Sequence, residues 1–232
     1  MGEVVSKSLK MPLVHSDLFI KENVGTEEQR KKLKQEILED KEKTPTILNS
    51  NDGCWRGDNY YPSMEWLYED VKNLVMESNE HYKIYDNKFA EMLEKCNNTR
   101  YTHWTNVNES GSKNLLHTHD HDCWAGIYYL QADGTGCITF HNPANLVQSC
   151  PPVSVFTRRV EITPKDGDLF MWPGWLPHEV ELNKSDKQRI NIAWGVNFNY
   201  VDSYPMPPIR GKLEWGKHTR IKNHFTKEER HG

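Results

Sequence analysis

The sequence predicts a mainly β domain with helices at its N-terminal end (an α+β arrangement), and two observations carry this prediction. Before about residue 99, apolar residues recur at helical spacing, whereas from Arg100 onward the period changes to two. The alternating segments are RYTHWTNV, NLLHTH, WAGIYYLQ, GCITFH, TRRVEI, DLFMW and RINIAWGVNF. Glycine, proline and Asp-Gly pairs separate them, which is typical of the short strands and turns of a sandwich or jelly roll.

Composition excludes several classes of protein. The chain has 232 residues, enough for one large domain, and a formal net charge of -4, which argues against a nucleic-acid or membrane-surface partner. No run of 18 apolar residues is present, and the first residues lack the apolar core of a secretion signal. The five cysteines are scattered without a CxxC pair, so neither a zinc knuckle nor a disulfide framework is indicated. We therefore expect a cytoplasmic protein, and the oligomeric state stays open.

The first part of the chain contains one well-marked helix. A short apolar piece at Leu13–Ile20 is a candidate edge strand. Thr26 and Gln29 then form a capping-box pattern, and a narrow apolar stripe runs on to about Lys43, so we predict a helix there. Residues 44–62 are rich in Pro, Asn, Gly and Asp and are predicted to form a loop.

A second helix is expected to start at Pro62 or Ser63. Its stripe of Met64, Leu67, Val71, Leu74 and Val75 is typical of packing on a core. A third helical segment is expected at residues 87–96. We divide the chain into an N-terminal helical supporting region (1–99), a β core (100–200) and a Pro-rich, then basic, C-terminal extension (201–232).

The segment HTHDHD, residues 117–122, is the strongest candidate for a functional site. It places three histidines and two aspartates directly before an apolar strand. Residues two apart on a strand point the same way, so His117 and His119 share a face, as do His119 and His121 or Asp120 and Asp122. Imidazole and carboxylate ligands suit first-row transition metals.

A third ligand has to come from elsewhere in the chain. His178, which follows a Trp/Pro-rich bend and enters a new strand, is the best candidate. Arg189 opens the last alternating segment, on the polar face that also carries Asn191. An inward guanidinium beside a metal histidine suits a bidentate carboxylate.

These pieces resemble the iron(II)/2-oxoglutarate-dependent oxygenases. The shared features are a His pair two residues apart, an IYYL strand, a distal His and an Arg about ten residues later; the PHEV, RINI and IYYL strands look like those of prolyl hydroxylases. The chain more closely resembles a family of 2-oxoglutarate oxygenases known from marine bacteria and their phages. Its motifs appear here as SNDGCW, HTH with AGIYYL, FHNPA, GDLFMWPGWLPH and RINI.

The resemblance implies a double-stranded β-helix, the cupin-like jelly roll, with a metal inside one end. It assigns His117 and His178 as iron(II) ligands, Arg189 as the residue that holds the 2-oxoglutarate C5 carboxylate, and Tyr129 as a neighbour of that cofactor. The implied reaction is hydroxylation by a dioxygenase that converts 2-oxoglutarate and O2 into succinate and CO2.

The second ligand departs from the common pattern. The superfamily usually has His-x-Asp or His-x-Glu, whereas this chain has His117-Thr118-His119. Either His119 replaces the carboxylate, giving a three-histidine site, or the chain bulges and Asp120 or Asp122 turns inward. We favour His119, because the resembling family also has His at this position, and three neutral ligands should hold iron(II) less tightly than a carboxylate site.

The remaining expectations concern the pocket and the substrate. We expect Asn106, Asn108 and Asn191 to line the pocket, with Asn106 and Asn191 among the cofactor contacts, and Trp124 and Trp194 to serve packing. The substrate is a small molecule or a peptide, and the strand resemblance points to a prolyl or other protein residue. Two rival functions are a cupin-like three-histidine oxidase that needs no 2-oxoglutarate and a non-catalytic metal-binding module.

Overall fold

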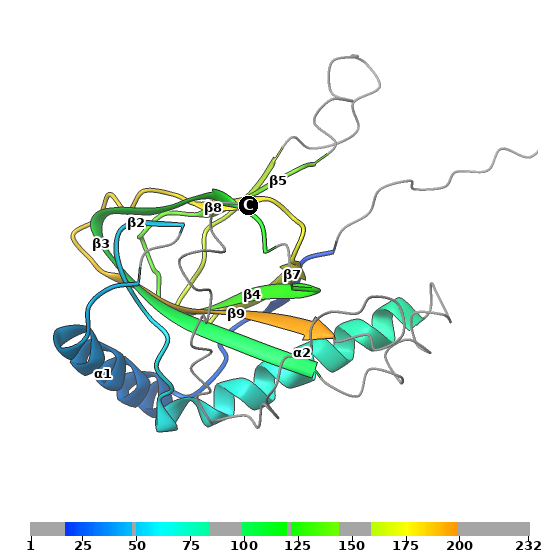
Figure 1. The fold of residues 1–232 in the computed structure, drawn as a ribbon, viewed down its shortest axis with the longest axis horizontal. Helices are drawn as coiled ribbons and strands as arrows, with labels where there is room; N and C mark the ends of the chain where they lie inside the picture. The colour runs from blue at the N-terminus through cyan, green and yellow to red at the C-terminus, as the bar shows by residue number, and fades with distance from the viewer. Residues whose placement is uncertain (1–16, 48–49, 84–98, 120–121, 144–158, 199–232) are drawn as a thin grey trace, which may run out of the picture.

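The computed structural model describes residues 17–47, 50–83, 99–119, 122–143 and 159–198. Within these ranges the helices come first and most strands follow, in the predicted order. The strands form one curled antiparallel sheet that folds over on itself, with the helices against one side (Figure 1). The predicted third helix (87–96) and the C-terminal extension (201–232) lie outside the described residues.

The first helix, α1 (Glu27–Lys43), has the predicted capping box. The Thr26 hydroxyl accepts a hydrogen bond from the Gln29 backbone N–H, and the Gln29 side chain accepts one from the Thr26 N–H. Two donors that the first helical turn leaves without partners are thereby satisfied. Leu33 and Ile37 are fully buried, so the narrow apolar stripe is the face that packs.

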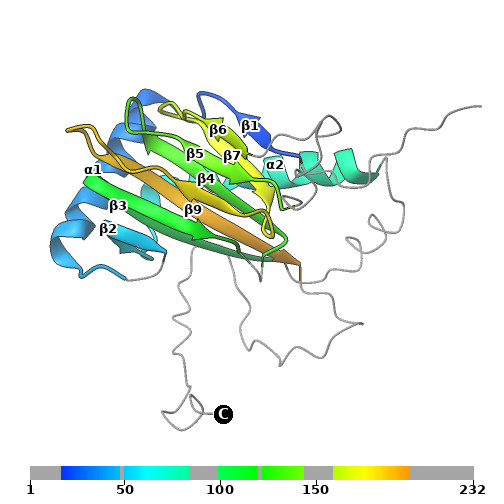
Figure 2. The same ribbon diagram turned by 90° about the horizontal axis from the view of Figure 1, so that it is seen from above.

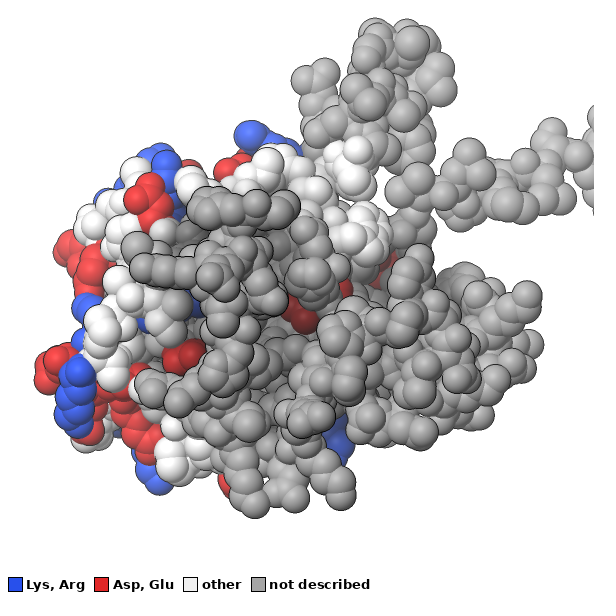
Figure 3. All heavy atoms as spheres, viewed as in Figure 1, with Lys and Arg blue, Asp and Glu red and all other residues white. Residues whose placement is uncertain are grey.

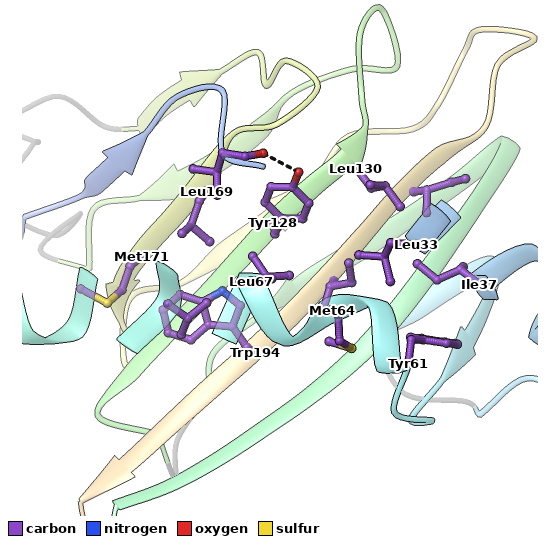
Figure 4. Packing of buried hydrophobic residues seen from close by; sticks show 14 of the residues in the cluster. Leu33, Ile37, Tyr61, Met64, Leu67, Tyr128, Leu130, Leu169, Met171 and Trp194 are labelled. Atoms are coloured by element: carbon purple, nitrogen blue, oxygen red, sulfur yellow. Dashed lines mark hydrogen bonds between the residues drawn. The ribbon is translucent and has the colours of Figure 1, made fainter. Parts of the chain in front are cut away.

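The second predicted helix starts where expected. A 3-10 turn, η1 (Pro62–Met64), leads into α2 (Glu65–Lys83). All five residues of the predicted stripe are buried. In Figure 4 the side chains of α1, η1 and α2 point at the same face of the sheet, with Tyr128 and Trp194 among their neighbours. The Tyr128 hydroxyl donates to the Val24 carbonyl at 2.8 Å, which ties this face to the segment before α1.

The predicted loop at residues 44–62 is wrong over its middle part. Residues Asn51–Gly57 form β2, which pairs antiparallel with the long strand β3 (Thr99–His117). The composition misled the prediction because a β-bulge between Asp52 and Cys54 uses Gly53 at a φ of 71°, a conformation that favours glycine.

The other strands are β1 (Phe19–Lys21), β4 (Trp124–Gln131), β5 (Ile138–His141), β6 (Arg159–Ile162), β7 (Leu169–Pro173), β8 (His178–Val180) and β9 (Arg189–Phe198). Their order is β1-β7-β4-β9-β3-β8-β5-β6. Figure 1 shows two layers, with β4 and β9 in the layer next to the helices and β5 and β8 in the second layer, and Figure 2 shows the strands running in about the same diagonal direction. This jelly-roll arrangement confirms the predicted fold class. The predicted edge strand is present as β1, displaced toward residue 21; residues 13–16 of that prediction are not described.

Strand β3 connects the two layers. Sequence patterning predicted two strands here, but the structure has one strand of 19 residues. Its first part pairs with β9 from Thr99 to Asn108, and its end pairs with β8 at Asn114 and His117. Gly111, at a φ of 83°, lies between the two parts. The strand therefore carries its last residues from the helix-covered layer to the second layer.

Two apolar clusters lie on opposite faces of the first layer. The face toward the helices holds Trp124, Tyr128, Ile192 and Trp194, so the prediction that both tryptophans serve packing is confirmed. The space between the layers holds a second cluster, which consists of Ala125, Ile127, Tyr129, Ala132, Ile138, Phe140, Phe170, Trp172, Leu176, Val180 and Ala193. Figure 3 shows basic and acidic atoms interspersed on the described part of one molecular face. No helix in the part of the chain that the structure describes is long and apolar enough to cross a membrane.

Candidate metal centre

The pairing of β3 with β8 places two histidines opposite one another. His117, the last residue of β3, is the register partner of His178, the first residue of β8, and their ring centroids are 4.4 Å apart. His119 lies two residues beyond the strand, where its backbone N–H donates to the Gly174 carbonyl at 2.8 Å. Its ring centroid is 5.1 Å from each of the other two imidazoles.

These three side chains form a group with the geometry of a metal site. One ring nitrogen from each lies within 4.8 Å of the others. No other set of three or more His, Cys, Asp or Glu side chains in the described ranges meets that condition. Three imidazole nitrogens are a donor set suited to iron and related first-row metals, so the residues fit such an ion.

Backbone carbonyls set the orientation and tautomer of two of the imidazoles. Nδ1 of His117 lies 2.6 Å from the Leu115 carbonyl, and Nδ1 of His178 lies 2.9 Å from the Leu176 carbonyl. A carbonyl only accepts hydrogen bonds, so each Nδ1 carries the proton. In the neutral ring, Nε2 then has a free lone pair, which is the form that binds a metal.

Burial keeps these rings neutral. His178 is 3% exposed, and desolvation together with the neighbouring His117 lowers the pKa of His178 to about 3. Burial also lowers the pKa of His117, and the Arg56 guanidinium acts in the same direction. Both imidazoles therefore remain unprotonated at neutral pH and are able to bind a metal.

The carboxylate alternative receives less support from the geometry. Asp122 is outside the triad of converging nitrogens; its Oδ2 lies 3.8 Å from Nδ1 of His119, which places it behind that ring. Asp120, the other alternative, lies outside the described residues. A carboxylate behind a ligand imidazole orients the ring, which is a common arrangement in metal sites.

Two glycines make room for the segment that carries His119. A Cβ on Gly174 would lie 2.0 Å from the Asp122 carbonyl oxygen, and a Cβ on Gly195 would lie 2.1 Å from Asp122 Oδ2. Neither distance is tolerable for a real side chain. Sequence reasoning missed both residues, because nothing local to residue 174 or 195 reveals an approach from residue 122.

Aromatic rings and amides form the walls of the site. Trp172 packs edge-on against His178 with centroids 4.7 Å apart, and Trp104 stacks on His119 at 5.4 Å. A cavity of about 30 Å³ lies among these groups, and both Asn106 and Asn191 line it, as expected. Their side chains are hydrogen-bonded to each other at 2.9 Å. Asn108 is buried but absent from the lining; it bonds to the Asn114 side chain instead.

Arg189 and Tyr129 lie further along the same inner surface. Arg189 is two residues from Asn191 on β9, and Tyr129 is the register partner of Asn191 on β4. Both are fully buried, and neither lines the cavity itself. Arg189 donates to the Thr135 and Glu181 carbonyls at 2.6 and 3.1 Å.

The polar atoms of this pair are incompletely satisfied. Nε of Arg189 and the Tyr129 hydroxyl have no hydrogen-bond partner, and no carboxylate of the described residues lies within 4.0 Å of the guanidinium. Desolvation lowers the pKa of Arg189 and raises that of Tyr129. A buried guanidinium without a counter-ion is costly, and these donors fit a carboxylate such as that of 2-oxoglutarate.

Residues 102–195, which include the three histidines and Arg189, match the family described as "Putative 2OG-Fe(II) oxygenase". No curated protein matches the sequence.

The fold is similar to solved oxygenases at low identity. A prolyl hydroxylase in complex with a hypoxia inducible factor peptide fragment, from Trichoplax adhaerens, is 15% identical, with a TM-score of 0.55 over 78% of this chain and 83% of that chain. A prolyl-4-hydroxylase from Pseudomonas putida is 12% identical, with a TM-score of 0.55 over 78% of this chain and 91% of that chain. HygX from Streptomyces hygroscopicus, with nickel, 2-oxoglutarate and hygromycin B bound, is 12% identical, with a TM-score of 0.55 over 80% of this chain and 84% of that chain.

The family match covers the strands that bring the histidines together, and the fold around them is the jelly roll of these oxygenases. The three imidazoles fit iron(II), and the buried Arg189 guanidinium fits a carboxylate of 2-oxoglutarate. Residues 102–195 of this chain are therefore similar to that oxygenase family, and they lie in a jelly-roll fold like that of the solved oxygenases.

Proposed function

We propose that this protein is a 2-oxoglutarate- and iron(II)-dependent oxygenase that hydroxylates a substrate C–H bond, with iron(II) held by His117, His119 and His178. The reaction consumes substrate, O2 and 2-oxoglutarate and yields the alcohol, succinate and CO2, so that one oxygen atom enters each organic product. The observation that carries the proposal is the convergence of three imidazole nitrogens within 4.8 Å, two of them on rings whose Nδ1 faces a backbone carbonyl.

In this proposal the iron supplies O2 activation, and the chain supplies orientation and exclusion of water. The carbonyls of Leu115 and Leu176 hold two ligand rings in the metal-binding tautomer. Trp104 and Trp172 pack against two of the imidazoles and restrict the movement of those rings. The packed walls restrict which part of a substrate reaches the metal.

The second element of the proposal is an anchor for 2-oxoglutarate. Arg189 and Tyr129 hold its C5 carboxylate, with Asn106 and Asn191 between that anchor and the histidines. The support is the pair of unsatisfied buried donors at Arg189 Nε and Tyr129 Oη. A bound carboxylate would satisfy both donors and neutralise the guanidinium.

The first substrate class to test is a prolyl or other residue of a peptide. The support is the structural similarity to two prolyl hydroxylases, which is similarity of fold and so bears only weakly on the substrate. A small molecule is the second class, because HygX, a relative of equal similarity, is seen with hygromycin B.

A three-histidine oxidase without 2-oxoglutarate is the second candidate function. The observation in its favour is the absence of a carboxylate from the triad among the described residues. Such an enzyme has no use for Arg189, whereas here a fully buried guanidinium lies on the same strand face as Asn191, which lines the cavity. A non-catalytic metal-binding module would likewise not require that residue.

The test separates binding of 2-oxoglutarate from turnover. Iron(II)-loaded protein is titrated with 2-oxoglutarate without oxygen, and the metal-to-ligand absorption band is recorded; oxygen is then admitted and succinate is measured. We expect the band in the native protein and in the matched control Arg159→Ala, which removes an exposed guanidinium on β6, and we expect Arg189→Ala to lose it. Absence of the band in the native protein rejects 2-oxoglutarate as co-substrate, and binding without substrate-dependent succinate across peptides and small molecules indicates a module without catalysis.

A further inference from the structure

Arg56 lies on the wall of the metal centre, although its segment was expected to be a loop. In β2 it is the register partner of Asn106, which lines the cavity. Opposed residues of an antiparallel pair project to the same side of a sheet, so the Arg56 side chain lies on the inner face. Its guanidinium carbon is 4.7 Å from the centre of the Trp104 ring, and that ring stacks on His119.

The guanidinium of Arg56 has no partner of opposite charge. None of its nitrogens forms a hydrogen bond to a described residue, and Nε is buried without a partner. Asp58 is the nearby carboxylate that acts on it, but Asp58 is exposed and lies beyond the 4.0 Å of an ion pair. Desolvation lowers the pKa of Arg56, so the chain bears a cost for holding this cation here.

Arg56 and Arg189 differ in ways that suit different ligands. Arg189 is fully buried and fixed by two backbone carbonyls. Arg56 is partly exposed, as are His117 and His119. A residue that is reachable from solvent suits a ligand that enters and leaves with each turnover, whereas the enclosed Arg189 suits the co-substrate.

We propose that Arg56 binds an anionic oxygen group, a carboxylate or a phosphate, of the primary substrate, and thereby selects acidic substrates and positions them at the metal. A guanidinium presents its donors in a planar fork that matches such groups, and the Trp104 face holds the fork in place. The inference rests on the proposed function, because it specifies the substrate of the same centre. The acidic group belongs equally well to a side chain or terminus of a peptide or to a free acid.

The test uses charged and neutral analogues in matched pairs. The panel contains N-acetyl amino acids with their primary amides, short peptides ending in a carboxylate or an amide, and phosphomonoesters with their parent alcohols. Each compound is titrated without oxygen into the iron(II) and 2-oxoglutarate complex, and the shift of its absorption band is followed. We expect at least one acid to bind about tenfold more tightly than its neutral analogue, which corresponds to about 1.4 kcal/mol, because only the anion forms charge-assisted hydrogen bonds with the guanidinium. If the preferred acid is an N-acetyl amino acid or a peptide, the bound group is a carboxylate; if it is a phosphomonoester, the bound group is a phosphate.

Variants assign the selectivity to the residue. In Arg56→Gln the acid should bind no better than its neutral analogue, Arg56→Lys should retain part of the preference, and Arg159→Gln should match the native protein. The 2-oxoglutarate band must persist in all three, which shows that each variant is folded and that the co-substrate anchor is separate. A native protein without preference for any acid, or a preference that survives Arg56→Gln, overturns the proposal.

The proposed function can fail independently of this inference. If the native iron complex never shows the 2-oxoglutarate band, the panel is repeated by calorimetry on zinc-loaded protein. Acid binding that depends on Arg56 then supports the anionic site although the oxygenase assignment fails. No acid binding there overturns the inference as well.

Discussion

The two faces of β9 are equally buried but differ in chemistry. Toward the helices the strand presents Ile190, Ile192, Trp194 and Val196, each at most 4% exposed. Toward the second layer it presents Arg189, Asn191, Ala193 and Gly195, which are also buried. The alternation of a single strand therefore separates an apolar surface from a polar one across the thickness of one sheet.

This contrast separates stability from function. We call the helix-facing side of β9 the outer face and the side toward the second layer the inner face. Burial of the apolar side chains on the outer face stabilises the fold by about 25 cal/mol per Å² of surface removed from water. On the inner face, buried donors and acceptors such as Arg189 Nε and Asn106 Oδ1 lack partners, and each such atom costs about 1–3 kcal/mol. The helix-covered face thus supports a site that by itself destabilises the fold.

The largest effect is expected at the metal ligands of the inner face. His119→Ala should weaken iron(II) binding at least about hundredfold, because it removes one of three donors. Asp122→Ala should weaken it about tenfold, since its carboxylate lies behind the ring, and loss of such an orienting group typically costs 10–100-fold. Iron affinity is measured by competition with a chelator of known strength.

His119→Asp is the matching substitution that should strengthen iron(II) binding. It creates the common His-x-Asp pattern and replaces a neutral donor with an anionic one, so iron(II) should be retained more tightly than in the native protein. A larger loss in Asp122→Ala or Asp120→Ala than in His119→Ala would contradict the three-histidine assignment.

The second prediction concerns a substitution that disturbs packing on the outer face of β9 and leaves the residues of the inner face unchanged. Ile192→Ala removes a side chain that is 1% exposed and should lower the free energy of unfolding by about 2–5 kcal/mol. Iron stoichiometry under conditions where the variant is folded should stay at the native value. Urea unfolding measures the first quantity and metal analysis the second; loss of iron from folded Ile192→Ala would show that the two faces are not separable.

The contrast also explains which parts of the fold the sequence revealed. Residues that alternate or recur within one element leave a local pattern, so α1, α2 and most strands were predictable. Strand β2 was not, because its bulge at Gly53 and its Asn and Asp residues resemble a turn, and only pairing with β3 identifies it. The continuity of β3 through Gly111 likewise depends on partners distant in sequence.

For the site, the local signal was uneven. His117 and His119 were predictable from strand spacing, and His178 and Arg189 from order along the chain together with resemblance to a family. No local sequence pattern identified Arg56 as a site residue, because its place at the site depends on its contact with Trp104, which is distant in sequence. Contacts that are formed only by tertiary structure leave no periodicity to read.

The third prediction concerns the glycine through which β9 touches the ligand segment. Gly195→Ala places a Cβ 2.1 Å from Asp122 Oδ2, so Asp122 must move; we expect a loss of about 1–3 kcal/mol and iron binding weakened several-fold. Gly134→Ala is the control: it has no neighbour within 4 Å but a φ of 76°, so it should cost about 1 kcal/mol from backbone strain alone. Equal iron affinity in both variants would show that Asp122 does not orient His119.

The smallest effect is expected at the helix that supports the outer face. Thr26→Ala removes the hydroxyl that accepts from the Gln29 N–H and should lower the free energy of unfolding by about 1 kcal/mol. Thr26→Ser keeps the hydroxyl and should be close to native. Because α1 packs on the face that carries stability, neither variant should change iron or 2-oxoglutarate affinity. If either affinity changes while stability stays near the native value, then α1 influences the metal centre directly and not only through the stability of the fold.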